Sequence, residues 1–333
     1  MTRRTPAMTA LGIMLSISYV IALQSPRKDI PEIVFKPKQV FADIYDPTRI
    51  ELDKDGNVYI LSRQDHSIAV IQPSGTQARR IGRIGGRNGE LYMPTDFAIA
   101  PDGTVWVADG GNDRIQHFKA DGSFLGSFYV EGPADIAVPS VNEIAVVGLR
   151  DDALARLYTP QGKELRRLGE SVPVELASRQ EQAMLNRGRV YSLVPGQLLY
   201  HFSGLLTPAI HRLDIASGKV IQRIPVTDPA LEPIINEATK RLLEGRHEGE
   251  AIRLFATLNA TAVEPGTNNY WICPAGPFVL VYDSSGRKRA VLRPQRTNGQ
   301  PLGAHDIVLT RAGTGYFIAG RTIFAFDLSA TRF

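Results

Sequence analysis

The sequence predicts an all-β protein, a six-bladed β-propeller made of four-stranded antiparallel blades. The first observation is an internal repeat: residues 47–60 match residues 94–107 at an offset of 47, and the same offset pairs Gly75 with Gly122. The second is that each unit divides short β-branched and aromatic stretches by Asp-Gly turns, where glycine accepts the positive φ of tight hairpins. Four antiparallel strands in about 40–50 residues is the size of one propeller blade.

The later units are recognised by the glycine of their second turn, which recurs as Gly162, Gly218 and Gly286. The last unit begins at Asp306 and ends one strand short, and the segment 32–41 can supply the missing strand. Closing the circle in this way removes free sheet edges that would otherwise favour aggregation. We therefore expect a single propeller domain over residues 32–328, with insertions in the later blades.

One helix is expected within this chain, in an insertion near residues 228–248. Asp228 suits an N-cap, Pro229 suits the first helical position, and apolar residues then recur at helical spacing as far as Leu243. Gly245 is expected to end the helix. Two placements are open for the 228–258 stretch: a lid over the mouth of the central channel, or an addition packed on the outer wall.

Residues 1–24 have the composition of a targeting segment. Arg3 and Arg4 precede an uncharged run over residues 7–23, and small side chains suit cleavage after Ala22. The run lies near the lower limit of length for spanning a bilayer, so an uncleaved membrane anchor is the alternative to a signal peptide. The sequence therefore predicts a periplasmic or secreted propeller, or one tethered to a membrane through residues 7–23.

Composition excludes several other classes of protein. A formal net charge of +4 over 333 residues is too close to neutral for a nucleic-acid-binding protein. The single cysteine, Cys273, excludes an intrachain disulfide and a multi-thiolate zinc site. Because Cys273 follows aromatic and aliphatic residues on a predicted strand, we expect it to be a buried apolar residue and not a nucleophile.

The second unit resembles a known family. Residues 82–94, with the sequence GRIGGRNGELYMP, lead into DGTVWVAD at 102–109 and NDRIQ at 112–116, and this pattern is similar to the NHL repeat. The resemblance is strongest over residues 82–128. It implies a six-bladed propeller, of a kind that is often extracytoplasmic in bacteria. It implies no single activity, because NHL-like propellers serve as binding platforms, scaffolds, lyases and hydrolases.

The start of each innermost strand is expected to face the central channel on one side of the disc. We call this side the connector face, because it carries the links between blades and the loops between second and third strands; the opposite side is the turn face. When the units are aligned on their turns, charged or amide residues share this position: Arg49, Asp96, Asp135, Arg189, Asn259 and Asp306, with His305 next to the last. These residues are the candidates for ligand binding.

Two interpretations of this ring are open. Asp96, Asp135 and Asp306 could hold a hard cation such as Ca²⁺, or the opposed charges could seat a zwitterion or a sugar acid. Alternatively, the aspartates and arginines satisfy backbone groups and one another. No other cofactor is expected. A zinc site would need three converging histidines, and only His201 and His305 fall near the channel mouth.

The function predicted from these observations is a binding module that engages a protein or a small polar ligand through its connector face. The alternative is a metal-dependent hydrolase or lyase that uses the acidic channel site, as in lactonase-like and amidating-lyase-like propellers. A scaffold without a channel ligand is a third possibility. The sequence assigns no catalytic residue, and whether the protein is an enzyme stays open.

Overall fold

A computed structural model describes residues 30–41, 44–148, 152–174, 178–248 and 255–332 of the chain. Residues Pro31–Phe333 form one compact unit. The expected signal peptide or membrane anchor, residues 1–24, lies outside the described residues. Within those residues, no helix combines the length and the apolar character that crossing a bilayer requires.

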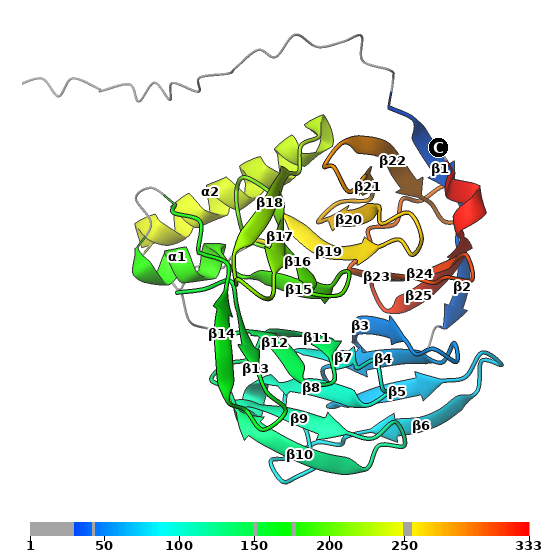
Figure 1. The fold of residues 1–333 in the computed structure, drawn as a ribbon. Helices are drawn as coiled ribbons and strands as arrows, with labels where there is room; N and C mark the ends of the chain where they lie inside the picture. The colour runs from blue at the N-terminus through cyan, green and yellow to red at the C-terminus, as the bar shows by residue number, and fades with distance from the viewer. Residues whose placement is uncertain (1–29, 42–43, 149–151, 175–177, 249–254, 333) are drawn as a thin grey trace, which may run out of the picture. The chain divides into compact units, whose positions relative to one another are not determined.

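The compact unit is a six-bladed β-propeller, as the repeats predict (Figure 1). Each of the first three blades is one sheet whose four antiparallel strands follow one another in the chain. Blade 1 contains β3 (Pro47–Leu52), β4 (Val58–Ser62), β5 (Ser67–Ile71) and β6 (Gln77–Ile81). Blade 2 contains β7 (Asp96–Ile99), β8 (Val105–Asp109), β9 (Arg114–Phe118) and β10 (Phe124–Tyr129), with a short 3₁₀ turn, η1 (Gly110–Asn112), between β8 and β9. Blade 3 contains β11 (Asp135–Ser140), β12 (Glu143–Val147), β13 (Ala155–Tyr158) and β14 (Glu164–Leu168).

The last three blades follow the same order, with additions. Blade 4 contains β15 (Gly188–Ser192), β16 (Gln197–Phe202), β17 (Ala209–Asp214) and β18 (Val220–Pro225). Blade 5 contains β19 (Leu258–Val263), β20 (Tyr270–Pro274), β21 (Val279–Tyr282) and β22 (Lys288–Pro294). Blade 6 contains β23 (Asp306–Leu309), β24 (Thr314–Ala319) and β25 (Thr322–Asp327), and a 3₁₀ turn, η3 (Leu328–Thr331), follows it.

The N-terminal segment closes the circle, but it does more than the sequence predicts. Strand β2 (Lys38–Phe41) pairs antiparallel with β25 and completes blade 6, as expected. Strand β1 (Glu32–Phe35) instead pairs in parallel with β22, so that blade 5 has five strands. The predicted closing segment therefore spans two blades, because its first half covers the exposed edge of the neighbouring sheet.

The turn glycines adopt the backbone conformation for which they were singled out. Gly103 in the first turn of blade 2 has φ +84°, and Gly122 in its second turn has φ +93°. L side chains rarely adopt this left-handed region, so these positions favour glycine. The core lies between the blades: strands β4, β5 and β8 are buried along their whole length, because each blade is covered by a neighbour on both faces.

The predicted helical insertion is present. A 3₁₀ turn, η2 (Pro229–Leu231), begins at Asp228, whose side chain accepts a hydrogen bond from the Ala230 backbone N–H at 2.9 Å, and it leads into α2 (Glu232–Glu248). The expectation that Gly245 ends the helix is wrong, since α2 continues three residues further. A single glycine within a helix costs only about 1 kcal/mol relative to alanine, which the rest of the helix can offset.

Helix α2 packs on blades 4 and 5 (Figure 1). Leu231 is buried in an apolar cluster with Ile210 of blade 4 and Tyr270 of blade 5, and Ile234 and Ile235 pack against this cluster. No described residue of α2 lines a cavity at the channel mouth. Part of the 228–258 stretch, residues 249–254, lies outside the described residues. For α2 itself, the structure therefore supports the second of the two predicted placements, an addition packed against the blades, over a lid on the channel mouth.

A second helix, α1 (Arg179–Leu185), was not predicted. It begins with a capping box in which the Ser178 side chain accepts from the Glu181 backbone N–H, and the Glu181 side chain accepts from the Ser178 backbone N–H. The Ser-x-x-Glu spacing is a sequence signal for such a start. The helix is only 7 residues long, too short to show an apolar period.

Candidate functional site

The six predicted ring residues come from six different blades and meet at the connector-face end of the channel. Each lies within the first three residues of an innermost strand, because the repeat places the same strand position at the same height in every blade. Asp96, Asp135, Arg189 and Asp306 are buried, and Arg49 and Asn259 are half-buried. The alignment of the divergent fourth and fifth units, which positioned Arg189 and Asn259, is therefore correct.

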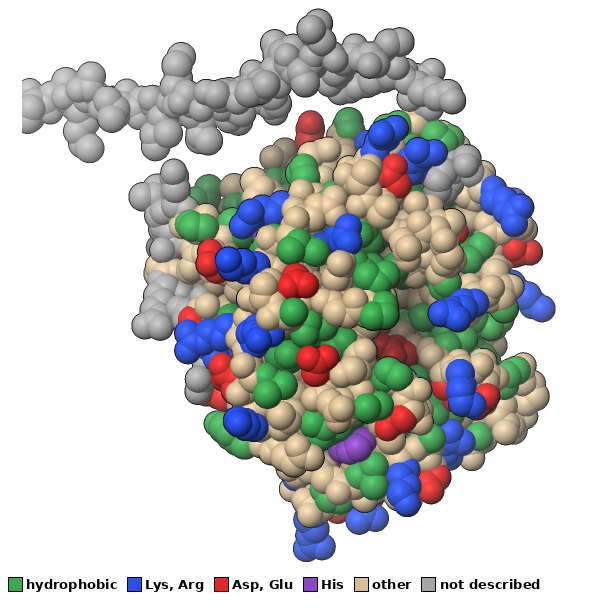
Figure 2. All heavy atoms as spheres, viewed as in Figure 1, with side chains coloured by type: hydrophobic (Ala, Val, Ile, Leu, Met, Phe, Trp, Pro, Cys, Tyr) green, Lys and Arg blue, Asp and Glu red, His purple; other side chains and the backbone are tan. Residues whose placement is uncertain are grey.

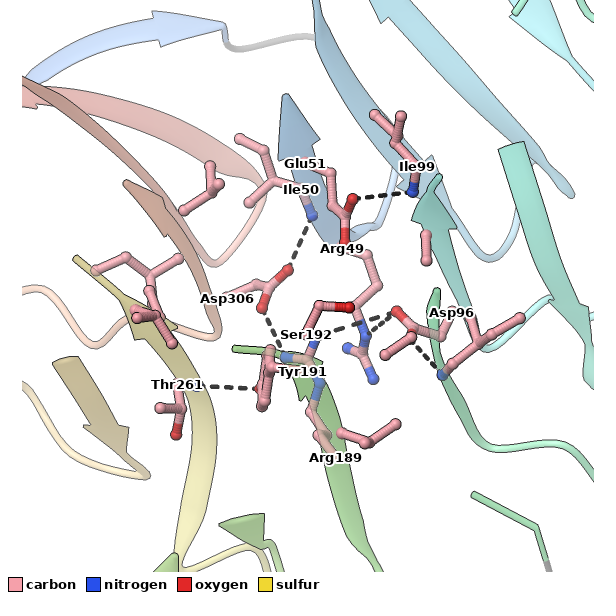
Figure 3. A pocket seen from close by; sticks show the side chains of 18 of the residues that line it. Arg49, Ile50, Glu51, Asp96, Ile99, Arg189, Tyr191, Ser192, Thr261 and Asp306 are labelled. Atoms are coloured by element: carbon pink, nitrogen blue, oxygen red, sulfur yellow. Dashed lines mark hydrogen bonds and ion pairs between the residues drawn. The ribbon is translucent and has the colours of Figure 1, made fainter. Parts of the chain in front are cut away.

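Arg189 is the centre of the ring (Figure 3). Its Nε lies 2.9 Å from Asp135 Oδ2 and its Nη1 lies 2.6 Å from Asp306 Oδ1. Its Nη2 lies 3.9 Å from Asp96 Oδ1. One guanidinium thus contacts carboxylates from three other blades, an arrangement that suits its planar fork of five N–H donors. Burial opposes the charge of Arg189, but the carboxylates hold its pKa above the ordinary arginine value.

Arg49 is the second cation of the ring. Its Nε lies 3.0 Å from Asp96 Oδ1, and its Nη2 lies 3.9 Å from Asp135 Oδ2. The ring therefore opposes three aspartates with two arginines. Burial and the charge of Asp96 raise the pKa of Asp135 well above its ordinary value, against the attraction of both guanidinium groups. The ring thus has one carboxyl group more than it has guanidinium groups, and the raised pKa of Asp135 favours a proton on that carboxyl.

All six carboxylate oxygens of the three aspartates accept a hydrogen bond. The oxygens that do not contact an arginine accept backbone N–H groups of the next blade. In the described residues, no group of three or more histidine, cysteine, aspartate or glutamate side chains is arranged to hold a metal ion. The geometry thus matches the interpretation in which the ring residues satisfy the backbone and one another.

A complete circle of interblade hydrogen bonds runs around the channel, one between each pair of neighbouring blades. In chain order, these bonds join Glu51 Oε2 to Ile99 N (3.1 Å), Asp96 Oδ2 to Ile136 N (2.9 Å), Asp135 Oδ1 to Val190 N (2.8 Å), Tyr191 OH to Thr261 N (3.0 Å), Asn259 Nδ2 to Ala304 O (3.2 Å) and Asp306 Oδ2 to Ile50 N (2.9 Å). We call this set the interblade circle. Five of the bonds satisfy a backbone N–H on an innermost strand, where no further strand can pair, and the sixth satisfies the Ala304 carbonyl in the link that leads into β23.

Glu51 and Tyr191 belong to the circle, but sequence reasoning missed both. Each lies two residues after a ring arginine, Arg49 or Arg189, and side chains two positions apart share one face of a strand. That alternation was the available signal. Burial, followed by the charge of Asp96, raises the pKa of Glu51 to about 8.

The two histidines singled out from the sequence have different surroundings. His201 on β16 is fully buried, and its Nδ1 lies 3.0 Å from Thr261 Oγ1 and 3.3 Å from the Tyr191 hydroxyl. Burial, with the positive charges of Arg189 and Arg49, lowers the pKa of His201 well below its ordinary value. His305 is exposed at the connector face. Cys273 is fully buried on β20, and burial raises its thiol pKa, as expected for a residue that only packs.

Two cavities meet at the ring. On the connector face lies a depression of about 1120 Å³, the connector-face bowl, whose lining includes Arg49, Arg63, Arg187, Arg189, Phe255 and Arg321. On the other side lies a cavity of about 250 Å³, the channel cavity, walled by the innermost strands and lined by residues that include Arg49, Glu51, Arg189, Tyr191, Ser192 and Thr261 (Figure 3). Arg49 and Arg189 line both cavities.

The bowl is rich in arginine. Five arginines and two aspartates, Asp46 and Asp135, line it. Three of the arginines, Arg63, Arg187 and Arg321, are exposed, and none of them forms an ion pair with a described residue. On the face that Figure 2 draws, basic and acidic side chains are interspersed.

A family model for the NHL repeat matches residues 91–118. These residues span the link into blade 2 and its first three strands. Within them, Asp109 accepts hydrogen bonds from the Tyr92 backbone N–H at 2.7 Å and from Arg114 Nε at 2.8 Å. The matched residues thus tie the interblade link to the blade that follows it.

Solved structures with the same fold come from proteins of unrelated activity. Virginiamycin B lyase from Staphylococcus aureus is 14% identical, with a TM-score of 0.56 and 88% of each chain covered. Hydrazine synthase from Kuenenia stuttgartiensis is 13% identical, with a TM-score of 0.55 over 86% of this chain and 97% of that one. The WD40 repeats of RRP9 are 9% identical, with a TM-score of 0.56 over 88% of this chain and 99% of that one. At these identities the similarity shows the fold alone: the chain is a six-bladed β-propeller that carries an NHL repeat in its second blade.

Proposed function

We propose that the protein is a binding module whose connector-face bowl receives an anionic group, carried by a small polar ligand or by a protein partner. The observation behind this proposal is the presence of three exposed arginines, Arg63, Arg187 and Arg321, around one depression of about 1120 Å³. They come from blades 1, 4 and 6, so their convergence depends on the closed propeller.

Arg187 is one of the bowl arginines that an incoming anion would contact. Although part of its side chain is exposed, burial lowers the pKa of its guanidinium, so its charge is poorly compensated. A carboxylate, sulfate or phosphate at this position would restore that compensation through charge-assisted hydrogen bonds. Arg321 stands with its guanidinium carbon 4.7 Å from the centre of the Tyr45 ring, which restricts its orientation toward the bowl.

The floor of the bowl supports binding more than catalysis. A metal-dependent hydrolase or lyase would use Asp96, Asp135 and Asp306 as ligands, and each of these carboxylates is already held by an arginine and a backbone N–H. Freeing them would require Arg189 to leave three ion pairs. Virginiamycin B lyase and the RRP9 WD40 repeats share the fold, so the fold alone does not choose between a lyase and a binding module.

We place this module outside the cytoplasm, delivered by residues 1–24 as a signal peptide or held there by residues 7–23 as an anchor. Cell fractionation of the full chain, followed by N-terminal sequencing of the mature protein, tests this placement. Recovery in the cytoplasmic fraction with an intact N-terminus would contradict it.

Binding is tested by calorimetric titration with glucuronate, citrate and inorganic phosphate as anionic probes. We expect at least one probe to bind, and the triple variant R63A/R187A/R321A to bind it at least about tenfold more weakly, since a hydrogen bond to a charged group contributes about 1.5–3 kcal/mol. Tight binding of Ca²⁺ or Zn²⁺ that depends on Asp96 or Asp306 would support the enzyme alternative instead.

The matched control is the triple variant R223A/R287A/R311A, which removes the same charge from exposed arginines that do not line the bowl. It should leave probe binding within about twofold of the original protein. If both triple variants bind the probe equally weakly, the loss reflects the net charge of the protein and not the bowl. If none of the three probes binds, the proposal that the bowl receives an anionic group is wrong.

A further inference from the structure

We propose that the channel cavity is a second site, independent of the bowl, which binds a small primary alkylammonium ion with its charged head at Glu51. The cavity measures about 250 Å³ and is lined by the innermost strands of all six blades. Figure 3 shows the Glu51 carboxyl within it, close to the ring. The bowl on the other side of Arg49 and Arg189 plays no part in this site.

Charge balance is the first argument. The residues lining the channel cavity include three acids, Glu51, Asp96 and Asp306, and two bases, Arg49 and Arg189. Asp135 lies directly behind them, bonded to Arg189 at 2.9 Å. Four carboxyl groups therefore face two guanidinium groups in a largely buried cluster. A buried excess of negative charge binds either protons or a cation, because leaving it uncompensated is costly.

Among the four carboxyl groups of the cluster, Glu51 is the one with an oxygen, Oε1, that accepts no hydrogen bond from a described residue. Its Oε2 accepts the Ile99 backbone N–H at 3.1 Å, and it forms no ion pair with a described residue. The three aspartates, in contrast, use both of their oxygens. The raised pKa of Glu51, about 8, is consistent with this setting, since it holds a proton that a cation would replace.

The rest of the cavity favours an organic ammonium over a metal ion. No described group of three or more acidic, histidine or cysteine side chains is arranged to coordinate a metal. The lining also includes Ser192, whose hydroxyl group is a further acceptor for an ammonium N–H, whereas the hydroxyl groups of Tyr191 and Thr261 already contact His201. Aliphatic residues, among them Val138 and Leu309, form the remaining wall, against which a short methylene chain loses contact with water.

The test is titration of the protein with n-butylammonium at several pH values. Glu51 faces Asp96 and Asp306, which repel its charge, and Arg189, which attracts it; Asp135 and Arg49 are the other charged groups of the cluster. Because binding must displace the Glu51 proton, affinity should rise by up to about tenfold per pH unit between pH 6 and 8. Tetramethylammonium, which has no N–H donor, should bind at least about tenfold more weakly.

Glu51→Gln keeps an acceptor for the Ile99 N–H and should reduce n-butylammonium affinity at pH 8 by at least about tenfold, with loss of most of its pH dependence. Glu170→Gln, at an exposed position outside the cavity, is the matched control and should bind as the original protein does. Ser192→Phe, which narrows the cavity without touching Glu51, should also weaken binding and serves if Glu51→Gln does not fold.

Equal binding by Glu51→Gln and the original protein, or no binding of n-butylammonium at pH 8, would overturn the proposal. Ca²⁺ or Na⁺ binding at Glu51 that excludes n-butylammonium would also overturn it, because the site would then be a metal site. The arginine triple variant R63A/R187A/R321A should leave n-butylammonium affinity unchanged, so failure of this site and failure of the bowl are separate results.

Discussion

Asp306 Oδ2 accepts the Ile50 backbone N–H at 2.9 Å across 256 residues of sequence, and this bond joins the last blade to the first. The other oxygen of Asp306 lies 2.6 Å from Arg189 Nη1. One side chain therefore closes the interblade circle and neutralises its central cation. The sheet pairing of β2 with β25 closes the same gap at the outer side of blade 6.

Asp306→Ala should lower the free energy of unfolding by about 3–5 kcal/mol, because it leaves a buried guanidinium without one of its partners. The measurement is urea unfolding followed by circular dichroism. Asp121→Ala, at an exposed turn on blade 2, is the control and should cost about 1 kcal/mol or less. A loss for Asp306→Ala no larger than that of the control would contradict a closing role for Asp306.

Tyr191→Phe should lower the free energy of unfolding by about 1–3 kcal/mol, because the Thr261 backbone N–H loses its acceptor inside the protein. Tyr129→Phe removes a hydroxyl group from a side chain that is 71% exposed and should stay within about 0.5 kcal/mol of the original protein. Thermal and urea unfolding of both variants would measure the difference. Equal stability of the two variants would mean that water replaces the Tyr191 hydroxyl without cost.

Glu51 should make the protein less stable as pH rises from about 5 to 8. Its pKa of about 8 in the folded protein exceeds the unfolded value of 4.5, so the folded state holds the proton more tightly. The stabilisation from that proton is complete below pH 4.5 and is lost as pH rises through 8, with a slope of at most about 1.4 kcal/mol per pH unit.

The comparison that isolates this effect is the original protein against Glu51→Gln, with urea unfolding measured between pH 6.5 and 8. The lowered pKa values of His201 and His211 also make stability depend on pH, but both proteins contain these histidines, so their contribution cancels in the comparison. The variant should lose less stability than the original protein across the window. Parallel curves would show that Glu51 is ionised throughout.

Phe35→Ala should cost about 3–5 kcal/mol, the usual loss for a buried phenylalanine. The Phe35 ring centre lies 5.0 Å from that of Phe326, so β1 contributes to the core between blades 5 and 6. Val34, its neighbour on β1, is 54% exposed, and Val34→Ala should change stability by no more than about 0.5 kcal/mol. If Phe35→Ala and Val34→Ala lower the free energy of unfolding by the same amount, β1 covers the edge of blade 5 without contributing to the core.

The blades could be predicted because their signals are local. A glycine such as Gly103 is selected by one backbone angle, and the sequence repeats such a turn glycine in each unit, which also aligned Arg189 and Asn259 with the ring. The pairing of β1 with β22 could not be predicted, since it depends on a sheet edge formed by residues about 260 positions away. The hydrogen-bond partners of the ring residues could not be predicted either, because nothing in the sequence near Asp96 indicates that it accepts a hydrogen bond from the Ile136 N–H.

The interblade circle has a consequence for how this propeller comes apart. Opening any one blade breaks two of its six bonds, one on each side, and exposes the inner edges of both neighbours. No blade can leave without weakening the next, so the disc should unfold in a single cooperative transition, unlike an open solenoid that frays from its ends. For the same reason the propeller should tolerate a circular permutation that opens one link between blades and joins residues 30 and 332, at the ends of the described chain, through a linker.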